Sequence, residues 1–242
     1  TVWGDHYPDD SYIAAQTERN RKALLHLIDR AACPYADLGS RYAAANCGPL
    51  FDDLEINRAW VRNAAGTDTA TSGRWAVGNP QPTSSGGAKQ LGRTVSGIRA
   101  LVTGAAAGSS AGANDVDGGT TTIRSRVIRL PEDPAAFGNL TFSWVFAHTA
   151  GSSAKDALRV LVEAEDGNQT VVFEVLGRPV NVNGSWRTAS IPLPAWAGPP
   201  IRLVMTATDG GKGHLGEAAH AILAELDKLG LSENTILVFT SD

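Results

Sequence analysis

Apolar and polar residues alternate through the middle of the chain in five short runs. The runs are rich in β-branched and aromatic residues, and Gly, Pro, Asn, Asp and Ser separate them. They cover residues 140–148, 157–164, 170–176, 186–194 and 201–207. A period of two with turn residues between the runs is typical of consecutive antiparallel strands. The pattern predicts an antiparallel β-sandwich or barrel.

The alternation also predicts which side chains face water. Within Leu158–Glu163, Arg159 and Glu163 fall on the solvent side and their apolar neighbours on the core side. Five tryptophans are expected to pack in or around this core, because buried rings dominate core energetics. The alternative is an aromatic surface strip for sugars. These tryptophans are Trp60, Trp75, Trp144, Trp186 and Trp196.

The two ends of the chain follow a helical period instead. Leu24, Leu27, Ile28 and Ala31 share one face of a helix predicted from Ser11 to about Ala32. From His214, the spacing of Ile222, Leu223, Leu226 and Leu229 predicts a second helix, and Thr235–Phe239 a buried strand.

We therefore expect a mainly β protein with an N-terminal helix and a C-terminal helix–strand tail. Residues 64–119, rich in Gly, Ser, Thr and Ala, are expected to form long loops between short strands. The predicted parts are residues 1–50, 51–213 and 214–242.

The composition and charge of the chain exclude some classes of function. The 242 residues are 43% hydrophobic and 19% charged, as in a folded protein, and the formal net charge is −4. The negative charge and the lack of a Lys/Arg cluster argue against a nucleic-acid partner, and no apolar run is long enough to span a membrane.

Cys33 and Cys47 are the two cysteines of the chain. Both lie in loop-like sequence, so we expect a disulfide of a secreted protein; two free buried cysteines are the alternative.

The first fifty residues resemble the end of the catalytic domain in secreted bacterial zinc metallocarboxypeptidases. The resemblance rests on Gly4-Asp5, the helix motif from Ala15 to Leu25, Cys33-Pro34-Tyr35 and Cys47-Gly48-Pro49. In that family the H-x-x-E pair and the later His that bind zinc lie upstream of this helix. The catalytic Glu comes just before the Gly-Asp, where Thr1-Val2-Trp3 stand here. The resemblance implies that zinc belongs to a part outside this chain, so no catalytic residue is assigned.

The middle of the chain resembles a MAM-type jelly-roll, a fold of two packed antiparallel sheets. Its first strand would be Phe51–Glu55 followed by Trp60, and Ile123–Pro131 also fits. Such domains follow the catalytic domain in some secreted bacterial peptidases. A MAM-type domain is expected to end in an acidic strand after Glu-Ala-Ala. Glu217-Ala218-Ala219 is present, but His220-Ala221-Ile222 follows it.

The last residues resemble a segment of sulfatases and related alkaline-phosphatase-like enzymes. The match runs from Leu223 through Leu229-Gly230-Leu231 and Asn234-Thr235 to Thr240-Ser241-Asp242. In that family the final Asp is a metal ligand, which makes Asp242 a candidate. A natural fusion, a truncated product and an assembled chimera all fit this order of segments.

Two short motifs look catalytic but lack the required context. Gly108–Gly112 fits G-x-S-x-G, yet the following Gly- and Asp-rich residues cannot open the helix that a nucleophile elbow needs. His214-Leu215-Gly216-Glu217 with His220 spells H-x-x-E, but on a helix the three side chains fan apart, and a solvated helix start is the simpler interpretation.

Acidic loop residues predict a structural cation. Glu55 lies on the expected first strand, and Asp115 and Asp117 in a Gly-flanked loop. Calcium prefers several oxygen ligands from flexible loops, so these three residues are candidate calcium ligands. Ordinary Asp-Gly turn chemistry is the alternative.

These features predict a non-catalytic accessory β-sandwich, for binding or stabilisation, in a secreted zinc carboxypeptidase. Its expected partner is its own catalytic domain, an extracellular protein or a polysaccharide. A fragment or fusion of a sulfatase-like metal-dependent hydrolase is the alternative, and we expect no enzymatic activity from this chain alone.

Overall fold

Two antiparallel sheets form the part of the chain that the structure describes. In this computed structural model the described residues lie within 50–226, apart from 53, 56–58, 96, 107–110, 131–138, 195–196, 198–199 and 211–218. The strands are β1 (Phe51–Asp52), β2 (Val61–Arg62), β3 (Trp75–Gly78), β4 (Ala100–Thr103), β5 (Gly119–Arg124), β6 (Asn139–Ala147), β7 (Ala157–Ala164), β8 (Gln169–Leu176), β9 (Arg187–Pro192), β10 (Ile201–Asp209) and β11 (Ala219–Leu226).

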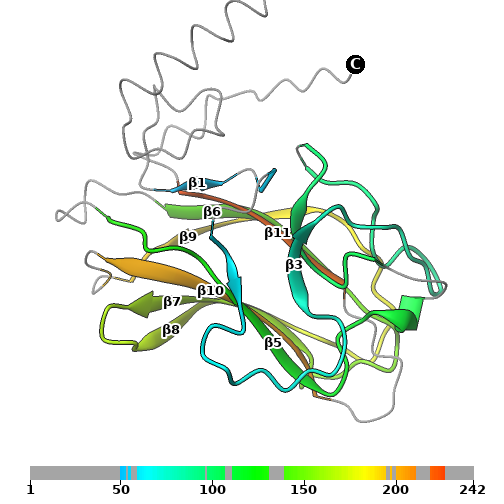
Figure 1. Ribbon diagram of the computed structural model, residues 1–242. Helices are drawn as coiled ribbons and strands as arrows, with labels where there is room; N and C mark the ends of the chain where they lie inside the picture. Colours follow the sequence, from blue (N-terminus) through cyan, green and yellow to red (C-terminus); the bar gives the residue numbers. More distant parts are fainter. Residues whose placement is uncertain are drawn as a thin grey trace, which may run out of the picture.

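The first sheet has six strands and the second has five. In the six-stranded sheet the order is β3-β4-β11-β6-β9, and β1 also pairs with β11. In the five-stranded sheet the order is β2-β5-β10-β7-β8. The two sheets lie as layers, with β6 and β11 in the upper layer of the view and β7, β8 and β10 in the lower one (Figure 1). The antiparallel β architecture predicted from the alternation is confirmed.

The core lies between the sheets because each long strand turns every second side chain inward. On β6 these are Leu140, Phe142, Trp144 and Phe146, all buried in one apolar cluster. Phe173 of β8 joins the layers, since its ring packs edge-on against Phe142 with a centroid distance of 5.1 Å.

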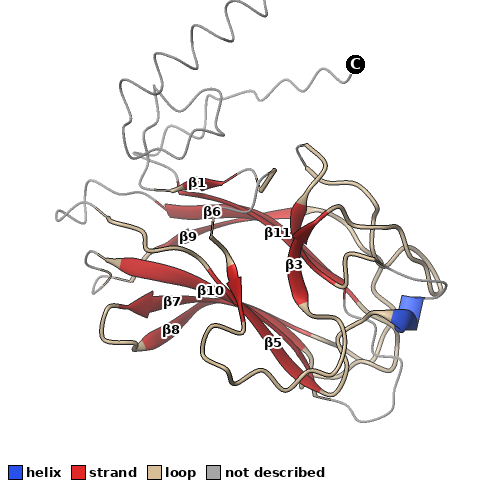
Figure 2. Cartoon of the chain, viewed as in Figure 1, coloured by secondary structure: helices blue, strands red, loops and turns tan. Residues whose placement is uncertain are grey.

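All five runs predicted as strands contain strands, and the described residues between 64 and 119 form loops around short strands as expected. Among the described residues the helical content is a single 3₁₀ turn, Ala111–Ala113 (Figure 2). None of the described residues lies in a helix long and apolar enough to cross a membrane.

The helix predicted from His214 is wrong for residues 219–226. These residues form β11, which pairs with β6 over its whole length and with β4 and β1 along its other edge. Ala and Leu favour helices, but a central position between strands supplies ladder partners on both sides, and this tertiary demand overrides the local preference. The six-stranded sheet therefore extends past the predicted boundary at residue 213, into the place where the jelly-roll resemblance expects a last strand.

Other predictions fall on residues outside the described part of the chain. They are the N-terminal helix at 11–32, Cys33 and Cys47, the H-x-x-E at 214–217, the strand at 235–239 and Asp242.

Candidate functional site

The outer face of the five-stranded sheet carries a row of side chains that crosses every strand. Val204 of β10 pairs with Leu161 of β7 and with Arg124 of β5. Leu161 pairs in turn with Val171 of β8, and Arg124 with Val61 of β2. Directly paired residues of an antiparallel sheet share a face. We call these five residues the central row.

The central row faces away from the core and is exposed at both ends. Its sequence neighbours on the long strands, among them Ile123, Leu203 and Val162, belong to the buried cluster between the sheets. Val204 is buried at the centre of the row, whereas Val61 and Val171 at the two ends are 51% and 48% exposed. The row is thus an aliphatic ridge with Arg124 set within it.

Hydrogen-bonding residues flank the central row on both sides. One flanking row, the charged row, consists of Gln169, Glu163 and Arg202, paired across β8, β7 and β10. The other, the mixed row, consists of Glu174, Arg159, Thr206 and Thr122. Gln169 and the members on β5, β7 and β10 lie two residues along their strands from the central row, or roughly 7 Å at the usual rise per residue. Glu174 lies three residues from Val171, because the pairing of β7 with β8 shifts register between Val160 and Leu161.

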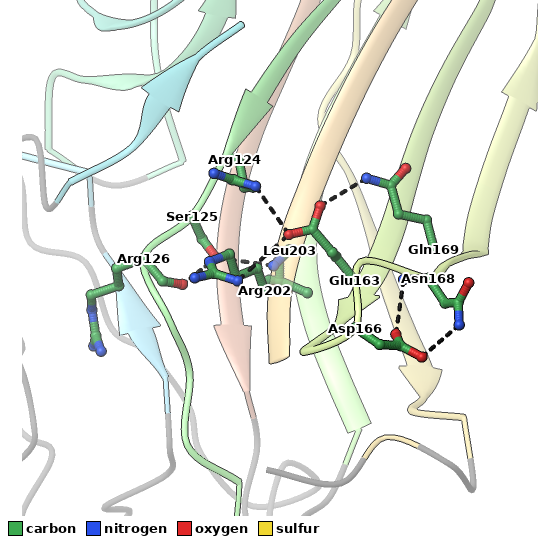
Figure 3. A network of polar contacts seen from close by, with 9 residues as sticks. All are labelled: Arg124, Ser125, Arg126, Glu163, Asp166, Asn168, Gln169, Arg202 and Leu203. Carbon is green, nitrogen blue, oxygen red and sulfur yellow. Dashed lines mark hydrogen bonds and ion pairs between the residues drawn. The ribbon is translucent and has the colours of Figure 1, made fainter. Parts of the chain in front are cut away.

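Glu163 holds the charged row together (Figure 3). Its Oε1 contacts Arg124 Nη1 at 3.2 Å and Arg202 Nη1 at 3.6 Å, and its Oε2 accepts a hydrogen bond from Gln169 Nε2 at 2.8 Å. The Glu163 side chain is only 8% exposed, whereas those of Arg124 and Arg202 are 34% and 32% exposed. The carboxylate therefore lies beneath two guanidinium groups that solvent can reach.

The alternation placed Arg159 and Glu163 on the outer face, but the prediction that both face water is wrong for Glu163, which is 6% exposed. Arg159 pairs with Glu174 at 2.5 Å in the mixed row. Glu163 is covered by arginines from two other strands, which no local pattern could indicate. Arg124 and Arg202 were missed as site residues because their proximity depends on the register between β5, β10 and β7.

The candidate calcium ligands do not converge in the structure. Glu55 Oε1 accepts hydrogen bonds from the backbone amides of Ile98 and Arg99 at 2.8 and 2.9 Å. Asp117 instead accepts the Ser72 hydroxyl at 3.0 Å, and the Asp115 backbone oxygen accepts the same hydroxyl at 2.7 Å. Among the described residues, no group of three or more His, Cys, Asp or Glu side chains is placed to hold a metal ion.

Calcium binding by Glu55, Asp115 and Asp117 stays a prediction that a thermal melt can test. A bound calcium ion would stabilise the folded chain by mass action. The unfolding midpoint in millimolar calcium would then exceed the midpoint in EDTA. Equal unfolding midpoints in calcium and in EDTA would contradict the predicted calcium site. Magnesium serves as the control for a general effect of divalent ions.

The described tryptophans pack as predicted and form no exposed platform. Trp60, Trp75 and Trp144 are buried. The Trp60 and Trp75 indole N–H groups donate to Asp52 Oδ2 and to the Thr121 backbone oxygen. Trp186 is half-buried and donates to the Arg93 backbone oxygen.

Two buried carboxylates at one end of the five-stranded sheet were not expected from the sequence. Asp156 accepts hydrogen bonds from the Ser152 hydroxyl at 2.7 Å and from the Ser153 and Gly210 amides at 2.7 and 2.9 Å. Burial raises the pKa of Asp156, but these hydrogen bonds and one with Asp209 outweigh it and hold the pKa below its ordinary value. Asp209 also accepts the Gly118 amide. At this end of the sheet the two carboxylates connect the loop before β7, the end of β10 and the loop before β5.

Lys89 is a further buried charge that ties two loops together. It is 1% exposed, and its Nζ donates to Asn181 Oδ1 at 2.7 Å and to the Val182 backbone oxygen at 3.2 Å. These bonds connect the β3–β4 loop to the β8–β9 connection. His148, also buried, has its ring against Phe146. It is a packed histidine.

The outer face of the five-stranded sheet is thus the surface where exposed apolar and hydrogen-bonding groups gather in an ordered array. Its central row offers flat aliphatic contact, and the flanking rows offer guanidinium, amide, carboxylate and hydroxyl groups. This arrangement can bind a ligand that is apolar on its face and polar along its edges.

No protein-family model and no curated protein matches this chain. Among solved structures it is similar to TmCBM61 in complex with β-1,4-galactotriose, with 12% identity over 71% of this chain and 89% of that one and a TM-score of 0.37. It is also similar to the enzymatically active domain of tailspike protein 4 from bacteriophage CBA120, with 13% identity over 74% of this chain, 20% of that chain and a TM-score of 0.35.

A third similar structure is described as a carbohydrate-binding module from the β-sandwich superfamily. The identity is 12%, over 75% of this chain and 61% of that chain, and the TM-score is 0.33. At these scores the similarities carry no functional assignment, and the candidate function rests on the outer face of the sheet.

Proposed function

We propose that this chain is a non-catalytic binding module whose ligand lies along the central row of the five-stranded sheet. The observation that carries the proposal is the order of the rows. One aliphatic row crosses all five strands, and a hydrogen-bonding row lies on each side of it. Strands spaced by about 4.8 Å give the central row a length of roughly 19 Å. An extended polymer can lie along such a row.

A polysaccharide fits the chemistry of this surface. A pyranose ring presents C–H groups on its face and hydroxyl groups along its edges. The faces would pack on Val61, Leu161 and Val171, while the edges reach the flanking rows. Protein interfaces usually centre on buried aromatic anchors. The exposed groups of the central row are instead small aliphatic side chains and one arginine.

The wider context of the module remains the one that the sequence resemblance implies. We infer that the module accompanies a secreted zinc carboxypeptidase as a MAM-like jelly-roll domain. The order of the described strands, with β11 as a last strand of the sandwich, supports the jelly-roll part of this proposal. The carboxypeptidase part rests on the motifs in residues 1–50. A sulfatase-like parent rests on the segment that ends at Asp242.

The proposed binding surface can be tested with valines of matched exposure. Val171 on the central row and Val180 in the β8–β9 connection are each 48% exposed. Replacing Val61 and Val171 together by serine should weaken polysaccharide binding about tenfold through lost apolar contact. Val180→Ser should leave binding unchanged. Affinity gel electrophoresis would measure both, with gels that contain polygalacturonate, methyl-esterified polygalacturonate, galactan, xylan or mannan.

Retardation of the unmodified chain in none of these gels would contradict the proposed function. Equal weakening by Val180→Ser would also contradict it, because the contact would then not depend on the central row. Thermal melts of the variants guard against misfolding. We expect unchanged midpoints, since substitutions at exposed positions usually change stability by less than about 0.5 kcal/mol.

A further inference from the structure

On the outer face of the five-stranded sheet, two arginines, Arg124 and Arg202, share one carboxylate, that of Glu163. Arg124 and Arg202 both contact the same oxygen of Glu163. The other oxygen of that carboxylate accepts from Gln169. One negative charge thus serves two guanidinium groups, and the cluster keeps a net charge of one positive unit.

The two guanidinium groups also keep most of their hydrogen-bonding capacity. An arginine has five N–H donors. Arg124 donates one hydrogen bond, at 3.2 Å, and Arg202 makes an ion pair at 3.6 Å, beyond hydrogen-bond distance. Within the described residues neither side chain has another polar partner. Because about a third of each side chain is exposed, the remaining donors can reach a ligand.

The neighbouring charges are already engaged or lie at the margin of the face. Arg159 in the mixed row is paired with Glu174. Asp166, in the β7–β8 turn, accepts hydrogen bonds from the Asn168 amide at 2.9 Å and from its side chain at 2.6 Å (Figure 3). Glu165, beside it in the same turn, is exposed. Arg126, beside the cluster, donates from Nη1 to the Val127 backbone oxygen at 3.3 Å and does not contact Glu163 in Figure 3. The arginines that share the Glu163 carboxylate and keep donors for a ligand are Arg124 and Arg202.

We propose that Arg124 and Arg202 bind the carboxylate groups of a polyuronate, an acidic polysaccharide that lies along the central row. The proposal deepens the proposed function and rests on it. The planar guanidinium group matches a carboxylate through paired N–H donors. The backbone of Arg124 lies in the central row, and its guanidinium group contacts Glu163 in the charged row. The apolar surface and the positive charge therefore lie side by side. A uronic acid ring has the same arrangement, with C–H groups on its face and a carboxylate at its edge.

Replacing Glu163 changes ligand affinity in opposite directions under the two interpretations of this cluster, as a ligand site or as a purely structural contact. If the cluster served only to hold β5, β7 and β10 together, removing any member would weaken the fold and the surface alike. If the arginines bind a ligand carboxylate through their remaining donors, the negative charge of Glu163 repels that carboxylate at short range. Its neutral replacement should then strengthen binding, while loss of the arginines weakens it.

The test uses the full 242-residue chain with polygalacturonate and its fully methyl-esterified form. The two polymers share a backbone and differ in charge. We expect the chain to bind the free acid about tenfold or more tightly than the ester, and to lose this preference in an Arg124→Gln/Arg202→Gln double variant. Isothermal titration calorimetry at low salt measures both affinities. Raising the ionic strength should reduce the preference, because salt screens exposed charges.

Two further variants complete the design. Arg74→Gln/Arg178→Gln removes the same charge from exposed loop positions away from the central row, and we expect it to keep the preference for the free acid. Glu163→Gln should bind polygalacturonate a few-fold more tightly than the unmodified chain. Thermal midpoints of all variants accompany the titrations.

Several results would overturn this inference. Equal binding of the acid and the ester would do so while leaving the proposed function intact, whereas binding of no polysaccharide would remove the proposed function itself. Weaker binding by Glu163→Gln together with a lowered thermal midpoint would assign the cluster a structural role only. A preference for poly-L-glutamate or for dextran sulfate over polygalacturonate would identify the ligand as an acidic protein or a sulfated polymer.

Discussion

Replacing Phe142 by alanine is expected to destabilise the protein by about 3–5 kcal/mol, the usual cost of truncating a fully buried aromatic side chain. Phe142 is 1% exposed at the middle of β6. Its ring packs edge-on against Phe173 of the opposite sheet, at 5.1 Å and an interplanar angle of 88°. Phe173 also packs against Trp144, so the cavity would open at the contact that joins the two layers. Urea unfolding followed by tryptophan fluorescence would measure the change.

Leu176→Ala is the matched control for Phe142→Ala. Leu176 is a large apolar residue on β8, but it is 38% exposed. Its truncation should cost less than about 1 kcal/mol, because little buried area is lost. Equal losses in the two variants would show that the contact between Phe142 and Phe173 does not hold the layers together.

Asp156→Asn is expected to lower the free energy of unfolding by about 3 kcal/mol at neutral pH. The carboxylate is buried and accepts hydrogen bonds from the Ser152 hydroxyl and from the Ser153 and Gly210 amides. Asparagine keeps one acceptor oxygen but places an N–H₂ group where a donor already points. Hydrogen bonds to a charged group contribute about 1.5–3 kcal/mol each, and a buried donor left without a partner adds to the loss.

The same residue makes stability depend on pH, with a defined sign. The folded pKa of Asp156 lies below its ordinary value of 3.8, because the hydrogen bonds to the carboxylate outweigh the desolvation that raises it. The unfolded chain thus binds the proton more readily. The stabilisation is fully present above the unfolded pKa and is lost as pH falls through the folded pKa. Urea unfolding from pH 7 down to pH 2 should show this loss in the unmodified chain.

Asp156→Asn should lack that part of the acid sensitivity, since the side chain no longer titrates. Asp166→Asn, in an exposed turn, is the control and should follow the unmodified chain. An Asp156→Asn profile that keeps the whole acid transition would assign the sensitivity to other carboxylates.

The same strands serve the core and the proposed binding surface. On β7, Leu158, Val160 and Val162 are buried between the sheets, and Leu161 and Glu163 lie on the opposite face. Because the side-chain period of a strand is two, the core and the outer face can change independently. Substitutions in the central row therefore test binding without opening the core.

Local sequence determined the strands of the sandwich. The alternation within 140–148, 157–164 and 201–207 predicted β6, β7 and β10, because a strand's period is visible in a few consecutive residues. It also placed Arg159 and Glu163 on the outer face. The packing of Trp60, Trp75 and Trp144 followed from ring size, since large apolar side chains favour burial.

Only the tertiary structure decided the rest. Residues 219–226 have helical spacing, yet they form β11 because β6 and β4 supply ladder partners on both sides. Lys89 is buried through bonds to residues about ninety positions away. The central row combines residues from five strands, and the partners of Glu163 come from β5, β8 and β10. Such neighbours are set by strand order and register, which depend on contacts distant in sequence that no local pattern contains.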